Sequence, residues 1–93
     1  MLFIVSWKGS SENRNAIFKR FAKTGGPPPK GVKMLGRWHA AGSSGGIAIA
    51  EAADAALVQQ WMLDWSDLLE MDVRPALTDE QIGKLIAGVL GKK

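Results

Sequence analysis

The sequence predicts a single α+β domain in which strands alternate with helices. Apolar residues alternate with polar or small ones along 32–40 and 71–77, which is the period of a half-buried strand. They recur at three- and four-residue intervals along 57–65 and 82–90, which is the period of an amphipathic helix. Segments rich in glycine and proline separate these elements. At 93 residues the chain has the length of one domain, 1–93, near the small end of chains that fold alone.

The first strand and the first helix follow one another closely. Residues 2–8, LFIVSWK, are rich in β-branched and aromatic side chains and predict a strand. Ser10 or Ser11 then supplies a helix N-cap, and Glu12 complements the helix dipole. The helix carries an apolar stripe formed by Ile17, Phe18, Phe21 and Ala22. We expect it to end near Gly25, before the segment GGPPPKG, which is a stiff connection because successive prolines lack amide donors.

Two strands and a glycine-rich turn occupy the middle of the chain. Strict alternation along 32–40 places one set of side chains on one face: Val32, Met34, Gly36, Trp38 and Ala40. It places a second set on the other face: Lys33, Leu35, Arg37 and His39. We therefore expect Trp38 to pack beneath the helices, on the face opposite His39. The segment AGSSGG predicts a hairpin turn, and residues 46–52, GIAIAEA, predict the next strand.

Each of the last three elements is marked by a local pattern. Asp54 can cap a second helix. Its apolar face comprises Leu57, Val58, Trp61, Met62 and Trp65. Residues 71–77 form a fourth strand, in which Pro75 indicates a position at the sheet edge. Thr78 and Gln81 match a capping box for a third helix. The apolar stripe of that helix comprises Ile82, Leu85, Ile86, Val89 and Leu90.

The order β-α-β-β-α-β matches the ferredoxin-like split βαβ arrangement, an antiparallel sheet with both helices on one face, followed here by a C-terminal helix. The first and third strands are central in this topology. Both are apolar on both faces, whereas a sheet with one face in water would alternate apolar with polar residues. The third helix or a second copy of the chain must cover the second face. We favour the second copy, a homodimer through the open sheet face, because one helix covers only part of four strands.

Composition argues against several kinds of site and partner. The chain has no cysteine, which excludes disulfides and thiolate metal sites and favours the cytoplasm. His39 is the single histidine, so we expect no metal, and we expect no cofactor. The AGSSGG segment leads into a strand instead of a helix, which argues against a phosphate-binding loop. The net charge of +3 owes much to lysines near the C-terminus, and no apolar run is long enough for a membrane span, so we expect neither nucleic acid nor a membrane as partner.

Candidate ligand-binding residues lie on the strand predicted at 32–40. Alternation places Arg37 and His39 on one face together with Lys33. If a dimer closes over that face, these side chains line a cavity to which Trp7 contributes an apolar wall. A cation and an imidazole beside an apolar wall favour a small anionic or carbonyl-bearing aromatic ligand. The alternative is that Arg37 and His39 lie in water at a strand edge. No motif identifies a catalytic residue.

Three segments in order, GVKMLGRWHA, GGIAIAEA and DWSDLLEMDVRPALTDEQI, resemble a family of small uncharacterised bacterial proteins, a domain of unknown function. The resemblance covers nearly the whole chain, and its most specific part is GRWHA followed by a glycine turn and a strand that ends in an acidic residue, Glu51. The family looks like part of the dimeric α+β barrel superfamily, in which two ferredoxin-like sheets pack face to face and each subunit encloses a pocket. The resemblance implies this fold and a homodimer, and it identifies no catalytic residue.

Two classes of function follow from this reasoning. The first is a homodimeric small-ligand-binding protein, which the resemblance allows to be a cofactor-independent enzyme of the monooxygenase or isomerase type. The second is a non-catalytic interaction or sensor module built on the same dimer. RNA-recognition domains share the element order, but they present stacking aromatic residues on the first and third strands, and GIAIAEA contains none. We therefore do not expect RNA binding.

Overall fold

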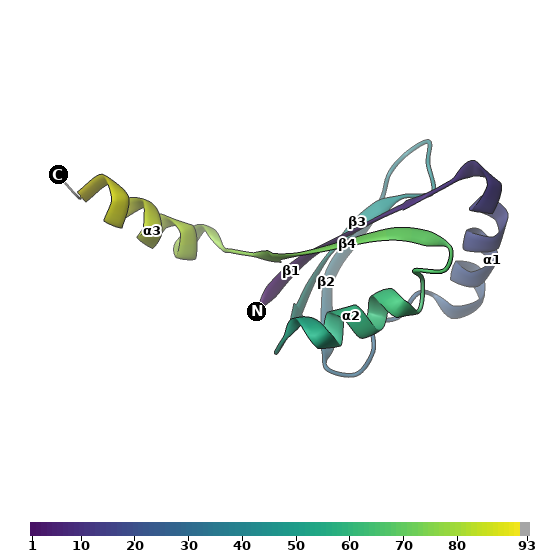
Figure 1. Ribbon diagram of the computed structural model, residues 1–93, viewed down its shortest axis with the longest axis horizontal. Coiled ribbons are helices and arrows are strands. Elements are labelled where there is room, and N and C mark those ends of the chain that lie inside the picture. Colours follow the sequence, from purple (N-terminus) through teal and green to yellow (C-terminus); the bar gives the residue numbers. More distant parts are fainter. Residues whose placement is uncertain (92–93) are drawn as a thin grey trace.

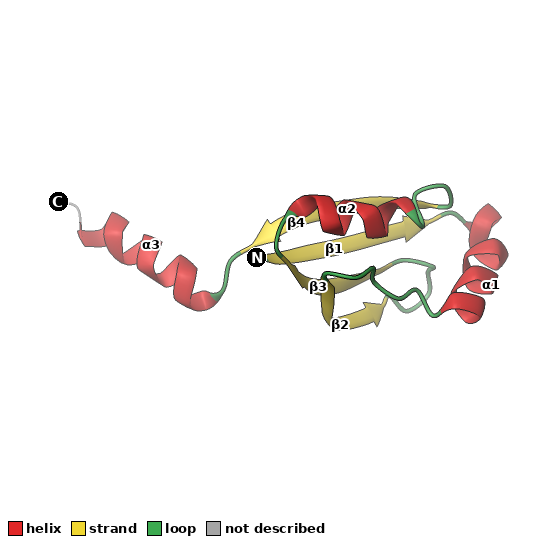
Figure 2. Cartoon of the chain, turned by 90° about the horizontal axis from the view of Figure 1, so that it is seen from below, coloured by secondary structure: helices red, strands yellow, loops and turns green. Residues whose placement is uncertain are grey.

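The computed structural model describes residues 1–91, which form a four-stranded antiparallel sheet with helices (Figures 1 and 2). The elements are β1 (Leu2–Gly9), a short 3-10 helix η1 (Ser11–Asn13), α1 (Arg14–Thr24), β2 (Val32–His39), β3 (Gly46–Ala52), α2 (Ala55–Leu63), β4 (Leu69–Ala76) and α3 (Asp79–Gly91). The strands are ordered β2-β3-β1-β4, and each neighbouring pair is antiparallel. The prediction of a ferredoxin-like α+β fold followed by a C-terminal helix is confirmed.

Predicted caps mark the starts of α2 and α3, whereas the predicted Ser10 cap belongs to the 3-10 helix η1, and α1 begins after Asn13 without a side-chain cap. The Asp54 side chain accepts a hydrogen bond from the amide of Leu57 at 3.2 Å and begins α2. The capping box is reciprocal, since the Gln81 amide donates to Thr78 Oγ1 at 3.1 Å and the Thr78 amide donates to Gln81 Oε1 at 2.8 Å. Gly25 ends α1 with a φ of 76°, a conformation that favours glycine. Local sequence therefore determined where these helices begin and end.

The core lies between the sheet and α2, which covers one face of the sheet, whereas α1 stands across the strand ends (Figure 2). The buried residues of this core are Phe3, Val5, Val32, Ala48, Ala50, Ala52, Val58, Trp61 and Met62. The inward side chains of β3 are all alanines, so the large side chains of α2 pack close to the sheet. A second, smaller cluster of Ile17, Trp65 and Leu69 joins α1 to the start of β4.

A β-bulge interrupts β2 between Met34 and Gly36. Before the bulge Met34 pairs with Ala50, and after it Arg37 pairs with Ala48. Both alanines are buried beneath the helices, so Met34 and Arg37 face the same side although their positions differ by three, an odd number. The bulge therefore reverses the alternation that strict pleating predicts for the second half of β2.

The expectation that Trp38 packs beneath the helices is wrong because of this bulge. Trp38 pairs with Ile47 on the opposite face of the sheet and is 59% exposed. Its ring lies across Gly36, where any Cβ would collide with it. Lys33 precedes the bulge, so it lies on the face opposite Arg37 and not beside it as alternation predicts.

The face of the sheet away from α2 has no cover within residues 1–91. Five apolar residues form its centre, here called the open-face patch: Leu2, Ile4, Trp38, Ile47 and Ile49. The helix α3 does not cover this patch, because it extends away from the sheet at the end opposite α1 (Figures 1 and 2). All described residues of α3 are exposed, and no helix in 1–91 combines the length and apolar character needed to cross a membrane.

We expect Trp61→Ala to destabilise the fold by about 3–5 kcal/mol, because the side chain is 4% exposed and its loss leaves a cavity under α2. Leu63→Ala, two residues along the same helix, is the matched control, because Leu63 is 64% exposed and its truncation should cost less than about 1 kcal/mol. Urea unfolding followed by circular dichroism measures both. Equal midpoints for the two variants would contradict the placement of α2.

Candidate functional site

A cavity of about 340 Å³ lies between the sheet and the two helices α1 and α2. We call it the helix-side pocket. Most of its wall is aromatic or aliphatic and comes from β1, α1, the α2 region and β4: Trp7, Phe18, Phe21, Trp61, Trp65 and Met71. Residues of α1, which stands across the strand ends (Figure 2), and of the α2 region both line the pocket.

Polar side chains reach the pocket from the end of β2 and from the turn that follows it: Arg37, His39, Ser43 and Ser44. Of the residues that the sequence singled out, Trp7, Arg37 and His39 line one cavity, but this cavity lies on the helix side of the sheet and not on the open face over which a dimer was expected to close. Lys33 does not, because it lies beside Glu51 at a separate shallow hollow. The AGSSGG turn closes the β2–β3 hairpin, with the Ala40 amide donating to the Gly45 carbonyl at 2.9 Å.

The Arg37 guanidinium is held by the backbone that follows α1. Its Nη1 donates to the Gly26 carbonyl at 2.7 Å, and its Nη2 donates to the Gly25 carbonyl at 2.9 Å. The guanidinium carbon lies 4.8 Å from the centre of the Phe21 ring, within cation–π range. Gly26 has a φ of 57°, a conformation that side-chain-bearing residues rarely adopt. A Cβ there would also lie only 3.0 Å from Nη1 of Arg37, so both the backbone conformation and the available space favour glycine. Arg37 thus fastens the end of α1 to β2.

The His39 imidazole lies close to two aromatic rings. Its centre is 5.9 Å from the Trp7 ring in an edge-on arrangement and 5.2 Å from the Phe21 ring in a tilted one. Among residues 1–91 no hydrogen bond to the imidazole is seen, and His39 is exposed to solvent on the edge strand β2. Imidazole can donate from one nitrogen and accept at the other, which suits a carbonyl or hydroxyl group.

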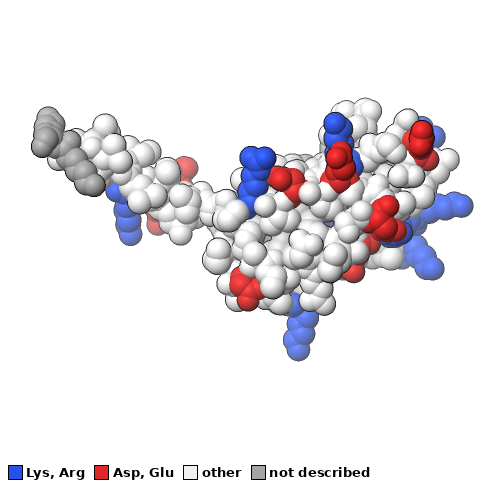
Figure 3. Space-filling model, in the orientation of Figure 1, with Lys and Arg blue, Asp and Glu red and all other residues white. Residues whose placement is uncertain are grey.

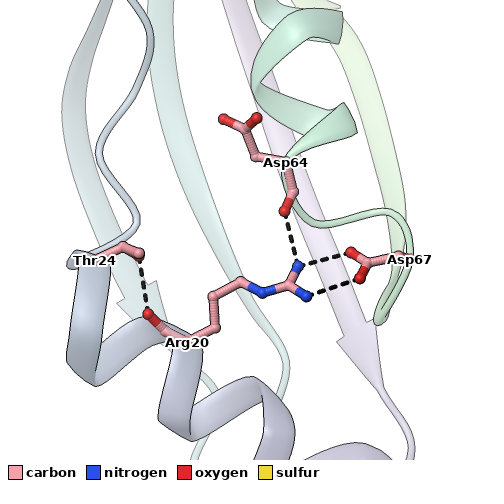
Figure 4. Close-up of polar contacts among 4 residues, drawn as sticks. All are labelled: Arg20, Thr24, Asp64 and Asp67. Atoms are coloured by element: carbon pink, nitrogen blue, oxygen red, sulfur yellow. Dashed lines mark hydrogen bonds and ion pairs between the residues drawn. The ribbon is translucent and has the colours of Figure 1, made fainter.

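A charged clamp joins α1 to the segment between α2 and β4 (Figure 4). The Arg20 guanidinium donates to both carboxylate oxygens of Asp67 at 2.7 Å and to the Asp64 carbonyl at 2.9 Å. Its Cζ also lies 5.5 Å from the centre of a Trp65 ring. Because Phe18, Phe21 and Trp65 belong to the pocket wall, this clamp and Arg37 together hold α1 in the position that creates the pocket.

The clamp shifts the protonation of its carboxylate. The hydrogen bonds from Arg20 hold the pKa of Asp67 below its usual value, although the pair is exposed to solvent. Bidentate geometry makes such a pair more specific than an ordinary surface ion pair, but solvent still screens it.

Sequence reasoning missed two parts of the site. It assigned Phe21 and Trp65 to core stripes, because helical spacing does not distinguish a buried side chain from one that lines a cavity. It did not pair Arg20 with Asp67, since 47 residues separate them and no local pattern links them. In the part of the chain that the structure describes, no three His, Cys, Asp or Glu side chains gather as metal ligands would.

A family model described as "Domain of unknown function (DUF3303)" matches residues 1–90. This match confirms the resemblance to a domain of unknown function over nearly the whole chain. No curated protein matches the sequence at a significant level.

We expect Asp67→Asn to lower the stability of the fold at pH 7 and to have less effect in acid. Because the folded pKa of Asp67 is depressed, its contribution is fully present above the unfolded pKa of about 3.9 and is lost as the pH falls through the folded pKa. Asp64→Asn is the control, since Asp64 offers Arg20 only its backbone carbonyl. Urea midpoints from pH 7 to pH 2 measure the effect, and a difference that stays constant across this range would contradict it.

Proposed function

Because the chain belongs to the DUF3303 family, whose model carries no function, we propose one from the site: a homodimeric protein that binds a small aromatic ligand in the helix-side pocket. The pocket itself carries this proposal. Ligand sites are concave, mostly apolar, and hold a few polar groups that orient the ligand. The helix-side pocket combines aromatic walls with Arg37, His39 and two serine hydroxyls at one side.

The volume limits the size of the ligand. An apolar cavity of about 150 Å³ holds one benzene ring. The helix-side pocket, at about 340 Å³, is about twice as large and offers room for a molecule of two fused rings. The aromatic residues in the lining, among them Phe21, Trp61 and Trp65, favour an aromatic ligand, because aromatic rings stack or meet edge to face.

The hydrogen bonds within the site favour a ligand of low charge. Two donors of Arg37 already bind the carbonyls of Gly25 and Gly26, which reduces what the guanidinium offers to an anion. No hydrogen bond to the His39 imidazole is seen among residues 1–91, and the imidazole lies beside the Trp7 ring. A neutral aromatic ligand with a carbonyl or hydroxyl directed at His39 therefore fits this site better than a carboxylate, although Arg37 keeps an anionic ligand as the second candidate.

Two readings of this pocket differ in whether chemistry takes place there. In a cofactor-independent enzyme, His39 is the general acid or base, because an imidazole can donate a proton from one ring nitrogen and accept one at the other. In a sensor or interaction module, the same contact only orients the ligand. Turnover of oxidisable or isomerisable aromatic compounds by the wild-type chain, and its loss in His39→Gln, would favour the enzyme.

The open-face patch supports the homodimer. Its apolar residues are contiguous across three strands, since Trp38 pairs with Ile47 and Ile49 pairs with Ile4. Charged residues of β4 border it, including the ion pair of Arg74 with Asp72 at 2.8 Å. An apolar centre with a polar rim is the usual anatomy of a protein interface. The outward side chains of β1 and β3 within this patch are aliphatic, which disfavours base stacking and hence RNA.

We expect 2-naphthol to bind more tightly than 2-naphthoate, because the neutral hydroxyl can bind His39 without placing a carboxylate in an apolar cavity. His39→Ala should weaken 2-naphthol binding about tenfold, the effect of one lost hydrogen bond. Lys33→Ala, a change on the other face of the same strand, should leave it unchanged. Tryptophan fluorescence titration measures all three proteins. Equal affinity for all three, or preference for naphthoate, would contradict the assignment.

The mass of one chain is 10.0 kDa. We expect sedimentation equilibrium of the wild-type protein at micromolar concentration to give twice this mass. Ile47→Asp should raise the dimer dissociation constant at least about tenfold, because it places a charge in the centre of the patch. Leu63→Asp is the control, since Leu63 lies on α2 away from this face and is 64% exposed. A wild-type monomer, or equal effects of the two variants, would overturn the proposed dimer.

A further inference from the structure

We propose that α3 is an exchanged arm, which crosses to a second copy of the chain and packs its apolar stripe on the β2–β3 part of that copy's open-face patch. The stripe, here called the arm stripe, comprises Ile82, Leu85, Ile86, Val89 and Leu90. The inference rests on the homodimer proposed above and adds to it the element that each copy contributes.

The first argument is that α3 has nothing to stabilise it within its own chain. It has 13 residues, none of them buried. Isolated helices of fewer than about 12–15 residues are marginal in water even when they are rich in alanine. Gly83, Gly88 and Gly91 weaken it further, and no atom outside the helix's own backbone lies within 4 Å of where their Cβ atoms would be. A helix with this composition needs a surface to pack against.

The second argument is the extended shape of the chain. The radius of gyration is 16.0 Å, and the longest extent is 56 Å against 29 and 18 Å in the other directions. A compact domain of this length has a radius of gyration of about 12 Å. The excess comes from α3, whose surface in the space-filling view is mainly uncharged (Figure 3). Apolar side chains in a projecting arm are typical of a segment that packs on another molecule.

The third argument distinguishes a second copy from the chain's own sheet. Only Leu77 and Thr78 join β4 to α3, and two residues span at most about 7 Å. In the order β2-β3-β1-β4, β2 lies three strand spacings, or about 14 Å, from β4. A helix folded back on its own sheet would begin over β4 and would cross the charged Asp72 and Arg74 side chains of that strand before it reached β3 and β2. A second copy can bring its β2 and β3 to the arm without this restriction.

The fit in size supports the same partner. A helix of 13 residues is about 20 Å long, and a strand of seven residues such as β3 is about 23 Å long. Half of the side surface of such a helix is about 350 Å², and the β2–β3 part of the sheet face is about 230 Å². A reciprocal exchange therefore buries about 1,200 Å² over both copies, the lower limit for a stable interface. Trp38, which is 59% exposed, offers the arm a large aromatic anchor.

Cross-linking between engineered cysteines tests the exchange, because the natural chain has none to interfere. Leu85→Cys lies in the middle of the arm stripe, and Ile49→Cys lies in the middle of the patch. The two single variants, one of them carrying a tag that changes its size, are mixed and treated with a short bismaleimide. We expect a product that joins one chain of each kind. Replacing Leu85→Cys by Leu63→Cys, which is exposed on α2, should give no such product.

The outcomes separate this inference from the proposed dimer. With the exchange, the double variant Leu85→Asp/Val89→Asp should sediment as a monomer while keeping its sheet signal in circular dichroism. If that variant stays a dimer, the dimer stands and the exchange is wrong. The same holds if a chain that carries both Leu85→Cys and Ile49→Cys forms the cross-link only within itself and never with a second chain. If the wild-type chain is a monomer, the dimer and the exchange are both wrong. Absence of any cross-link in a wild-type-like dimer also overturns the exchange.

Discussion

Between Met34 and Gly36, two residues of β2 occupy the place of one in the ladder with β3, and this β-bulge assigns side chains to the two faces of the sheet. It turns Arg37 and His39 toward the helices, where they line the pocket, and it turns Trp38 toward the open face. The bulge places the Trp38 ring over Gly36, in the space that the Cβ of any other residue would occupy, so this arrangement needs glycine at position 36. One inserted residue thus provides the polar groups of one surface and the aromatic anchor of the other.

The pocket depends on how α1 is held away from the sheet. Arg20 bonds to Asp67 on one side of α1, and Arg37 bonds to the Gly25 and Gly26 carbonyls at its end. Each guanidinium also lies over an aromatic ring of the pocket wall. Two arginines therefore act as spacers, and the cavity remains because α1 is fixed at its edges instead of collapsing onto the core.

The proposed ligand site and the proposed dimer interface lie on opposite faces of one sheet. The helix-side pocket lies on the α2 face, whereas the open-face patch and the arm stripe belong to the other side and to the projecting end of the chain. The two proposed functions can therefore be disturbed separately by substitution. They remain linked through β2, since neighbouring residues of this strand, Arg37 and Trp38, serve different faces. A shift of β2 on dimerisation would move the polar side of the pocket, which is the physical basis on which a sensor of this design could work.

The sequence by itself determined the elements, their order and those helix ends that a cap marks. Alternation, helical stripes and the caps at Asp54 and Thr78 are local properties that depend on neighbours a few residues away. Two-sided apolarity of the central strands also revealed the uncovered face. Tertiary structure alone decided which face His39 occupies, because the bulge belongs to the pairing of β2 with β3 and strict alternation does not predict it. It alone decided that Arg20 bonds to Asp67, because 47 residues separate the two in the chain. It alone decided that α3 packs on no other element among residues 1–91, because no local pattern shows whether a helix finds a surface to cover.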